Sequence, residues 1–192
     1  MSGPGYQDLP GDLPVPEDDG AAAQLAGRVL PPLVLRATAG APVNLSALGS
    51  PPGRPRAVLY VYPRTGQPGV PLPPGWDEIP GARGCTPESC GFRDAHQDLA
   101  GLGADVYGLS SQDTEYQAEL AERLGLPFPV LSDPGLELAG LLGLPTFTAG
   151  GERLYKRLTM IVSGGSVEHV FYPVFPPDGH AAEVAAWLSQ AG

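Results

Sequence analysis

The two cysteines are the residues of this 192-residue chain best able to do chemistry. Cys85 and Cys90 lie five positions apart, directly after a segment rich in proline and glycine. Residues 86–89, Thr-Pro-Glu-Ser, are typical of a helix start, with a hydroxyl, a proline and an acid in the first turn. A thiol at a helix N-terminus lies near free backbone N–H groups and a partial positive charge, which favour the thiolate. We therefore predict that Cys85 is a nucleophile.

A thiolate can attack one peroxide oxygen and release the other as hydroxide or alkoxide, which leaves a sulfenic acid on the cysteine. A second thiol can condense with this acid to form a disulfide, and Cys90 is the candidate for that step. On a helix of about 3.6 residues per turn, positions five apart point about 140° away from each other. Closure of an 85–90 disulfide therefore requires local unwinding, and we expect oxidation to lower the helicity of residues 85–93.

Passive and metal-binding roles are the alternatives for these cysteines. A free cysteine often packs as a small hydrophobe, and Cys90 could simply point into the core. The neighbours of Cys85, by contrast, do not form a core stripe. Zinc needs more ligands than two thiols, and the three histidines are scattered, at His96, His169 and His180. We expect packing or surface roles for the histidines, redox chemistry at the cysteines, and neither a metal nor an organic cofactor.

The composition argues against several classes of protein. The formal net charge of −10 at pH 7 leaves no basic surface for nucleic acid or an anionic membrane. The N-terminus shows no basic segment followed by an apolar run, and the chain has no stretch of about 18 apolar residues. Two cysteines cannot form a disulfide framework in a chain of this length. We expect a cytoplasmic protein that binds neither nucleic acid nor membrane.

Alternating strands and helices are predicted to position the cysteines. The run at 57–62, Ala-Val-Leu-Tyr-Val-Tyr, is typical of a buried central strand, and Pro63 ends it. An opening hairpin is expected over 33–45 and a second one over 158–172, around a Ser-Gly-Gly-Ser turn. Further strands are predicted at 104–109 and 128–131, and helices at 86–100, 113–124, 134–142 and 181–190. This order predicts the α/β class, with a mixed central sheet and helices on both faces.

The domain boundary is predicted from composition. Residues 1–28 combine proline, glycine and acidic residues, and such a segment buries too little apolar surface to fold alone. We therefore expect a flexible acidic arm at 1–28 and one domain at 29–192. Inside the domain, 63–84 is a long loop rich in proline and glycine, with Trp76 near its middle. We expect this loop to lack regular structure and to pack as a cover.

The segment 84–94, Gly-Cys-Thr-Pro-Glu-Ser-Cys-Gly-Phe-Arg-Asp, resembles the active-site segment of peroxiredoxins, specifically the bacterioferritin comigratory protein or peroxiredoxin Q branch. The similarity covers roughly residues 30–188. It implies a thioredoxin-like fold, with peroxide reduced at Cys85. It also implies an intramolecular disulfide with Cys90, recycled by thioredoxin or a similar dithiol reductant. We expect a monomer or a weak homodimer.

The same resemblance assigns roles to other residues. Arg157, which precedes a predicted apolar strand, matches the arginine that the family places beside the thiolate. A fixed cation lowers a thiol pKa and orients peroxide oxygens. Pro63, Gly84 and Thr86 are the candidates for contacts with the peroxide. Arg93 is expected to take part in a structural ion pair.

One feature departs from the family pattern. The family motif has a threonine three residues before the reactive cysteine and a proline four residues earlier, whereas this chain has Ala82 and Glu78 there. Residues 62–65, Tyr-Pro-Arg-Thr, resemble the front of that motif, which indicates an insertion of roughly fifteen residues within 66–83. Our hypothesis is that Thr65 folds back to donate a hydrogen bond to peroxide.

Two other functions use similar residues. A thioredoxin-like disulfide oxidoreductase shares the expected fold, but its Cys-x-x-Cys pair is replaced here by a wider spacing. A non-catalytic module that senses oxidation or binds a partner through the loop and the acidic arm is the third possibility. Turnover of peroxide with a thiol donor distinguishes the peroxidase from both.

Overall fold

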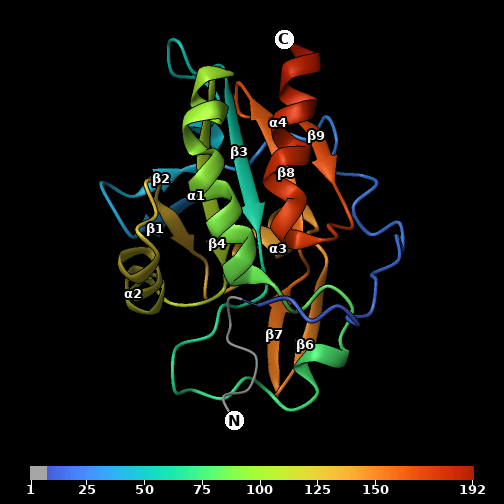
Figure 1. Ribbon diagram of the computed structural model, residues 1–192. Coiled ribbons are helices and arrows are strands. Elements are labelled where there is room, and N and C mark those ends of the chain that lie inside the picture. Colours follow the sequence, from blue (N-terminus) through green and yellow to red (C-terminus); the bar gives the residue numbers. More distant parts are fainter. Residues whose placement is uncertain (1–7) are drawn as a thin grey trace.

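The computed structural model describes residues 8–192 (Figure 1). A seven-stranded sheet forms its centre, in the order β2-β1-β5-β4-β3-β8-β9. β3 runs parallel to β4 and β4 parallel to β5, while the remaining neighbours are antiparallel. The strands span Val34–Ala37 (β1), Val43–Asn44 (β2), Arg56–Val61 (β3), Ala104–Ser110 (β4), Val130–Ser132 (β5), Leu158–Ser163 (β8) and Ser166–Phe171 (β9). The mixed sheet and both predicted hairpins are confirmed.

Helices cover both faces of this sheet. α1 and α4 lie side by side on one face, and α3 packs on the other (Figure 1). The sequence of β3 explains why both faces are covered: Val58 and Tyr60 point to α1 and α4, whereas Leu59 and Val61 point to the opposite core. The helices span Cys85–Gly101 (α1), Thr114–Leu124 (α2), Glu137–Leu142 (α3) and His180–Ala191 (α4). None of the helices in residues 8–192 is long and apolar enough to cross a membrane.

A short hairpin outside the main sheet was not predicted. It consists of β6 (Thr146–Ala149) and β7 (Glu152–Tyr155). Its signal is present in the sequence, because β-branched and aromatic residues flank a Gly-Gly pair. Gly150 and Gly151 have φ of +58° and +79°, the backbone that a two-residue hairpin turn of this kind requires.

Helix α3 starts later than the predicted residue 134. The two carboxylate oxygens of Asp133 accept hydrogen bonds from the backbone N–H groups of Glu137 and Leu138, at 2.9 and 3.0 Å. Leu136 adopts a left-handed backbone with φ of +53° directly before the helix. An acidic cap and a left-handed residue therefore delay the helix. The short strand β5 is likewise shifted, to Val130–Ser132.

The N-terminal segment differs from the expected flexible arm. Residues 1–7 lie outside the described residues, but 8–28 are seated on the domain. Leu25 is fully buried, and the backbone pairs with β9 through Gly27 N–H to Val167 O and Val167 N–H to Arg28 O, both at 2.8 Å. Asp19 accepts hydrogen bonds from Lys156 Nζ at 2.6 Å and from a tyrosine hydroxyl of the domain. The apolar residues of 21–25, buried at Ala22 and Leu25, hold the segment on the domain. The acidic composition of the whole segment did not indicate this.

Candidate active site

Cys85 is the first residue of α1, and it lines one cavity with Arg64 and Thr65, which follow the carboxyl end of β3. Its side chain is 3% exposed. The backbone before it turns sharply at Gly84, which has φ of +105°. A Cβ at Gly84 would lie 2.4 Å from Pro177 Cγ and 2.9 Å from Leu9 Cδ2. Glycine is therefore required here for two reasons, the left-handed backbone and the close approach of both side chains.

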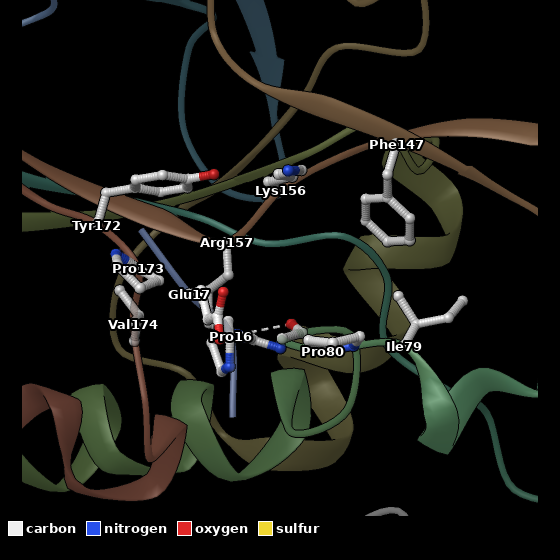
Figure 2. A pocket seen from close by; sticks show the side chains of 11 residues that line it. Pro16, Glu17, Ile79, Pro80, Phe147, Lys156, Arg157, Tyr172, Pro173 and Val174 are labelled. Carbon is white, nitrogen blue, oxygen red and sulfur yellow. Dashed lines mark hydrogen bonds between the residues drawn. The ribbon is translucent and has the colours of Figure 1, made fainter. Parts of the chain in front are cut away.

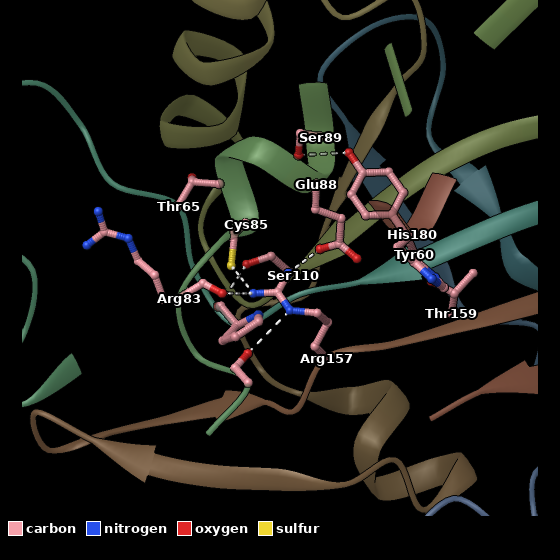
Figure 3. Close-up of polar contacts among 12 residues, drawn as sticks. Tyr60, Thr65, Arg83, Cys85, Glu88, Ser89, Ser110, Arg157, Thr159 and His180 are labelled. Atoms are coloured by element: carbon pink, nitrogen blue, oxygen red, sulfur yellow. Dashed lines mark hydrogen bonds and ion pairs between the residues drawn. The ribbon is translucent and has the colours of Figure 1, made fainter. Parts of the chain in front are cut away.

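Arg157 comes from the residue before β8 and reaches the sulfur of Cys85. Its Nη2 lies 3.1 Å from Cys85 Sγ (Figure 3). The guanidinium also donates to three carbonyls of the inserted loop, from Nε to Gly81 O at 3.3 Å and from Nη2 to Ala82 O and Arg83 O at 3.1 Å. These bonds fix the orientation of the guanidinium. The position of Arg157 beside the thiol matches the sequence expectation, whereas the three carbonyls were not foreseen.

Glu88 is a site residue that sequence reasoning missed. It is fully buried, and its Oε2 forms an ion pair with Arg157 Nη1. Figure 3 shows the guanidinium between the thiol and this carboxyl. Glu88 Oε1 has no hydrogen-bond partner among the described residues. The signal in the sequence was the spacing of Glu88 from Cys85, because residues three apart on a helix lie on the same side.

Burial and charge act in opposite directions on these groups. Burial raises the pKa of Glu88 to about 7, although Arg157 opposes this. Burial also raises the pKa of the Cys85 thiol above its usual value, although the positive charge of Arg157 opposes this. A charged Glu88 raises the thiol pKa further. A backbone hydrogen bond from Arg64 also lowers the Cys85 pKa. Cys85 and Glu88 are therefore two acids that share one buried cation.

The insertion brings Thr65 back toward Cys85. Thr65, Gly84 and Thr86 line one small cavity together with the cysteine. Thr65 donates its backbone N–H and its hydroxyl to Gln112 Oε1, at 2.9 and 3.1 Å, and its carbonyl accepts from Gln112 Nε2 at 3.2 Å. Its hydroxyl is thus directed to the loop after β4, which sequence reasoning did not foresee.

Pro63 is not among the residues that line this cavity. It is buried, and its carbonyl accepts a hydrogen bond from Ser110 Oγ at 3.3 Å. Of the four residues expected near the peroxide besides Arg157, the structure therefore brings Thr65, Gly84 and Thr86, but not Pro63, to the cavity that Cys85 lines.

The inserted loop packs against the β6–β7 hairpin. Trp76 is buried in a small cluster with Ala82 and Leu154, and its ring lies 6.1 Å from that of Phe147. The sequence predicted a cover without regular structure, but the loop contains one turn of 3-10 helix at Trp76–Glu78. Arg83 of this loop pairs with Asp77 at 3.0 Å.

Cys90 is half-buried, about 1.4 turns further along α1. Both cysteines are free, and α1 is continuous through both, so the structure represents the reduced form. Arg93 pairs with Asp94 at 2.8 Å and donates to Leu124 O at 3.0 Å, a structural role. His180 is buried, with Nε2 2.8 Å from Thr159 Oγ1.

Known proteins resemble this chain over most of its length. Residues 25–188 match the Redoxin family model. The chain is 32% identical over 163 residues to a chloroplastic peroxiredoxin Q of Sedum lineare, covering 84% of this chain and 76% of that protein. It is also 32% identical over 158 residues to the chloroplastic peroxiredoxin Q of Oryza sativa subsp. japonica, of which it spans 63%.

A solved structure supports the same fold. The crystal structure of the peroxidoxin BcpB from Mycobacterium tuberculosis superposes with a TM-score of 0.69 at 27% sequence identity. The match covers 88% of this chain and 99% of that one.

Proposed function

This chain belongs to the redoxin family, in its peroxiredoxin Q branch, and is a thiol-dependent peroxidase; we propose that Cys85 attacks the peroxide and that Cys90 resolves the product. The observation that carries this assignment is the 3.1 Å contact between Arg157 Nη2 and Cys85 Sγ. A fixed cation at this distance stabilises the thiolate and the negative charge that moves to the leaving oxygen.

The reaction at Cys85 is a displacement at oxygen. The thiolate attacks one peroxide oxygen, a sulfur–oxygen bond forms and the oxygen–oxygen bond breaks. The sulfur is oxidised by two electrons to sulfenic acid, and the leaving hydroxide or alkoxide takes up a proton. Arg157 and the backbone N–H of Arg64 supply positive charge at the reacting atoms. Free N–H groups in the first turn of α1 add to it.

Cys90 completes the cycle in this proposal. Its thiol condenses with the sulfenic acid at Cys85, which forms the disulfide and releases water. Because α1 is continuous through both cysteines, its first turns must unwind for the sulfurs to meet. A thioredoxin-like dithiol protein then reduces the disulfide. We also propose that the protein is cytoplasmic, in keeping with two cysteines that are both free, and that it is a monomer or weak homodimer.

Peroxide titration followed by mass spectrometry tests the two cysteine roles. Wild-type protein is expected to form the 85–90 disulfide. Cys90→Ser should accumulate sulfenic acid at Cys85, trapped by dimedone, and Cys85→Ser should react slowly. Amide exchange of residues 85–93 should increase on oxidation of the wild type and not of Cys90→Ser. Rapid oxidation of Cys85→Ser would reverse the assignment of roles.

A further inference from the structure

The cavity that reaches Cys85 is very small. Its volume is about 10 Å³, and it is lined by residues before the inserted loop, within it and at the start of α1: Arg64, Thr65, Gly66, Leu72, Trp76, Arg83, Gly84, Cys85 and Thr86. A space of about 10–15 Å³ holds one water molecule. We call this cavity the thiol slot. The insertion contributes four residues to its wall, of which Leu72 and Trp76 are the large apolar ones; the other two are Gly66 and Arg83.

A larger cavity of about 280 Å³ is lined by Arg157 and Gly81 among other residues (Figure 2). Figure 2 shows Ile79 and Phe147 on one side of it and Tyr172 and Val174 on the other. Cys85 does not line this cavity.

The wall between the two cavities is held by hydrogen bonds. The carbonyls of Gly81, Ala82 and Arg83 all accept from the Arg157 guanidinium. Because the cation is itself buried and paired with Glu88, opening this wall would leave buried polar groups unpaired. The larger cavity is therefore separated from the thiol.

Apolar contacts also surround Gly84, the residue before the first turn of α1. Pro177 and Leu9 pack so close to it that an added Cβ would lie 2.4 and 2.9 Å from their side chains. The loop that carries the slot wall is also held in place, since Trp76 packs on Phe147 and Leu154. The slot shares Leu72, Trp76 and Arg83 with a further cavity of about 280 Å³, which Cys85 does not line. Among these three cavities, the slot is the one that reaches the thiol.

From the small volume of the slot we propose that the inserted loop is a size filter, which makes hydrogen peroxide the substrate and excludes hydroperoxides with bulky organic groups. The inference rests on the proposed function of Cys85 and names its substrate class. Hydrogen peroxide has no organic group: one of its oxygens bonds to the Cys85 sulfur, the oxygen–oxygen bond breaks, and the other oxygen leaves as hydroxide, which takes up a proton to become water. A cumyl or tert-butyl group next to the reacting oxygens cannot pass a slot of one water's width.

Stopped-flow rate constants for the oxidation of Cys85 test the filter. Hydrogen peroxide, tert-butyl hydroperoxide and cumene hydroperoxide form a series of increasing size, and wild-type rate constants should fall along it. Leu72→Ala widens the slot, so the ratio of the rate constant for hydrogen peroxide to that for cumene hydroperoxide should fall by about tenfold. Ile79→Ala is the matched control. Ile79 is a half-buried side chain of similar size in the same loop, and it lines the larger cavity but not the thiol slot.

The outcomes separate the filter from the peroxidase function. Equal wild-type rate constants for all three peroxides would overturn the filter while leaving Cys85 a peroxidatic residue. The same holds if Ile79→Ala changes the ratio as much as Leu72→Ala does. Slow oxidation by every peroxide, hydrogen peroxide included, would overturn the peroxidase role of Cys85 itself. The wild-type series needs no variant, so it decides the question even if Leu72→Ala fails to fold.

Discussion

Glu88 forms a fully buried ion pair with Arg157, on the same guanidinium that contacts the Cys85 sulfur. The buried cation favours ionisation of both acids, but the negative charge of one acid disfavours ionisation of the other. The reactivity of Cys85 is therefore coupled to the protonation of Glu88.

Replacing Glu88 by glutamine should lower the pKa of the Cys85 thiol. The amide keeps an oxygen for Arg157 but removes the negative charge that raises the thiol pKa. The pH dependence of alkylation by iodoacetamide measures this, and the rate profile of Glu88→Gln should shift to lower pH. Glu122→Gln, an exposed substitution on α2, is the control. An unchanged or raised thiol pKa in Glu88→Gln would contradict the coupling.

The stability of the wild-type protein should depend on the ionisation of Glu88. Its pKa rises from 4.5 to about 7 on folding. Between these pH values the folded state holds a proton that the unfolded state has released, so this contribution to stability is present below pH 4.5 and is lost as pH rises through about 7. Urea unfolding should show the wild type losing on the order of 3 kcal/mol relative to Glu88→Gln between pH 4.5 and 8. His180, whose buried neutral ring acts in the opposite direction, is present in both proteins and cancels in the comparison.

Arg157→Lys should slow the reaction with hydrogen peroxide by about 100-fold. A lysine ammonium cannot contact the Cys85 sulfur, the Glu88 carboxyl and three loop carbonyls at once, as the guanidinium does. Stopped-flow measurement of Cys85 oxidation tests this. Arg153→Lys is the matched control, because Arg153 is exposed on β7 and its side chain donates to Thr146 Oγ1 on the neighbouring strand. Equal rates in Arg157→Lys and wild type would remove the arginine from the mechanism.

Gly84→Ala should destabilise the protein by about 2–3 kcal/mol, because it combines a left-handed backbone with a methyl group too close to Pro177. Urea unfolding of the reduced protein measures the change. Gly101→Ala is the control within the same helix, since an added Cβ there meets no atom within 4 Å. It should be neutral or stabilising by about 0.5–1 kcal/mol. Similar losses in the two variants would argue against a specific requirement at Gly84.

Leu25→Ala should cost about 2–4 kcal/mol, because it leaves a cavity in the main core. A mobile arm would make the same substitution silent. Val15→Ala in the same segment is the comparison, since Val15 is 63% exposed and its loss should change stability by less than about 0.5 kcal/mol. Chemical denaturation of both variants distinguishes a seated segment from a flexible one.

The sequence by itself determined the local elements and the chemistry of the cysteines. Strand β3, the start of α1 at the Thr-Pro-Glu-Ser segment, and the family all follow from patterns within short stretches of chain. Such patterns reflect backbone propensity and burial, which neighbouring residues largely set. The β6–β7 hairpin carried a comparable local signal in its Gly-Gly turn and was missed.

Only the tertiary structure decided how the site is enclosed. The pairing of Glu88 with Arg157 joins residues 69 positions apart, and the contact of Leu9 with Gly84 depends on the path of the N-terminal segment. The hydroxyl of Thr65 could be directed to peroxide or to Gln112, and the fold directs it to Gln112. Composition and periodicity do not encode the path of a long loop, because its position is set by contacts with distant elements. The reactive thiol was therefore predictable from the sequence, whereas the slot around it was not.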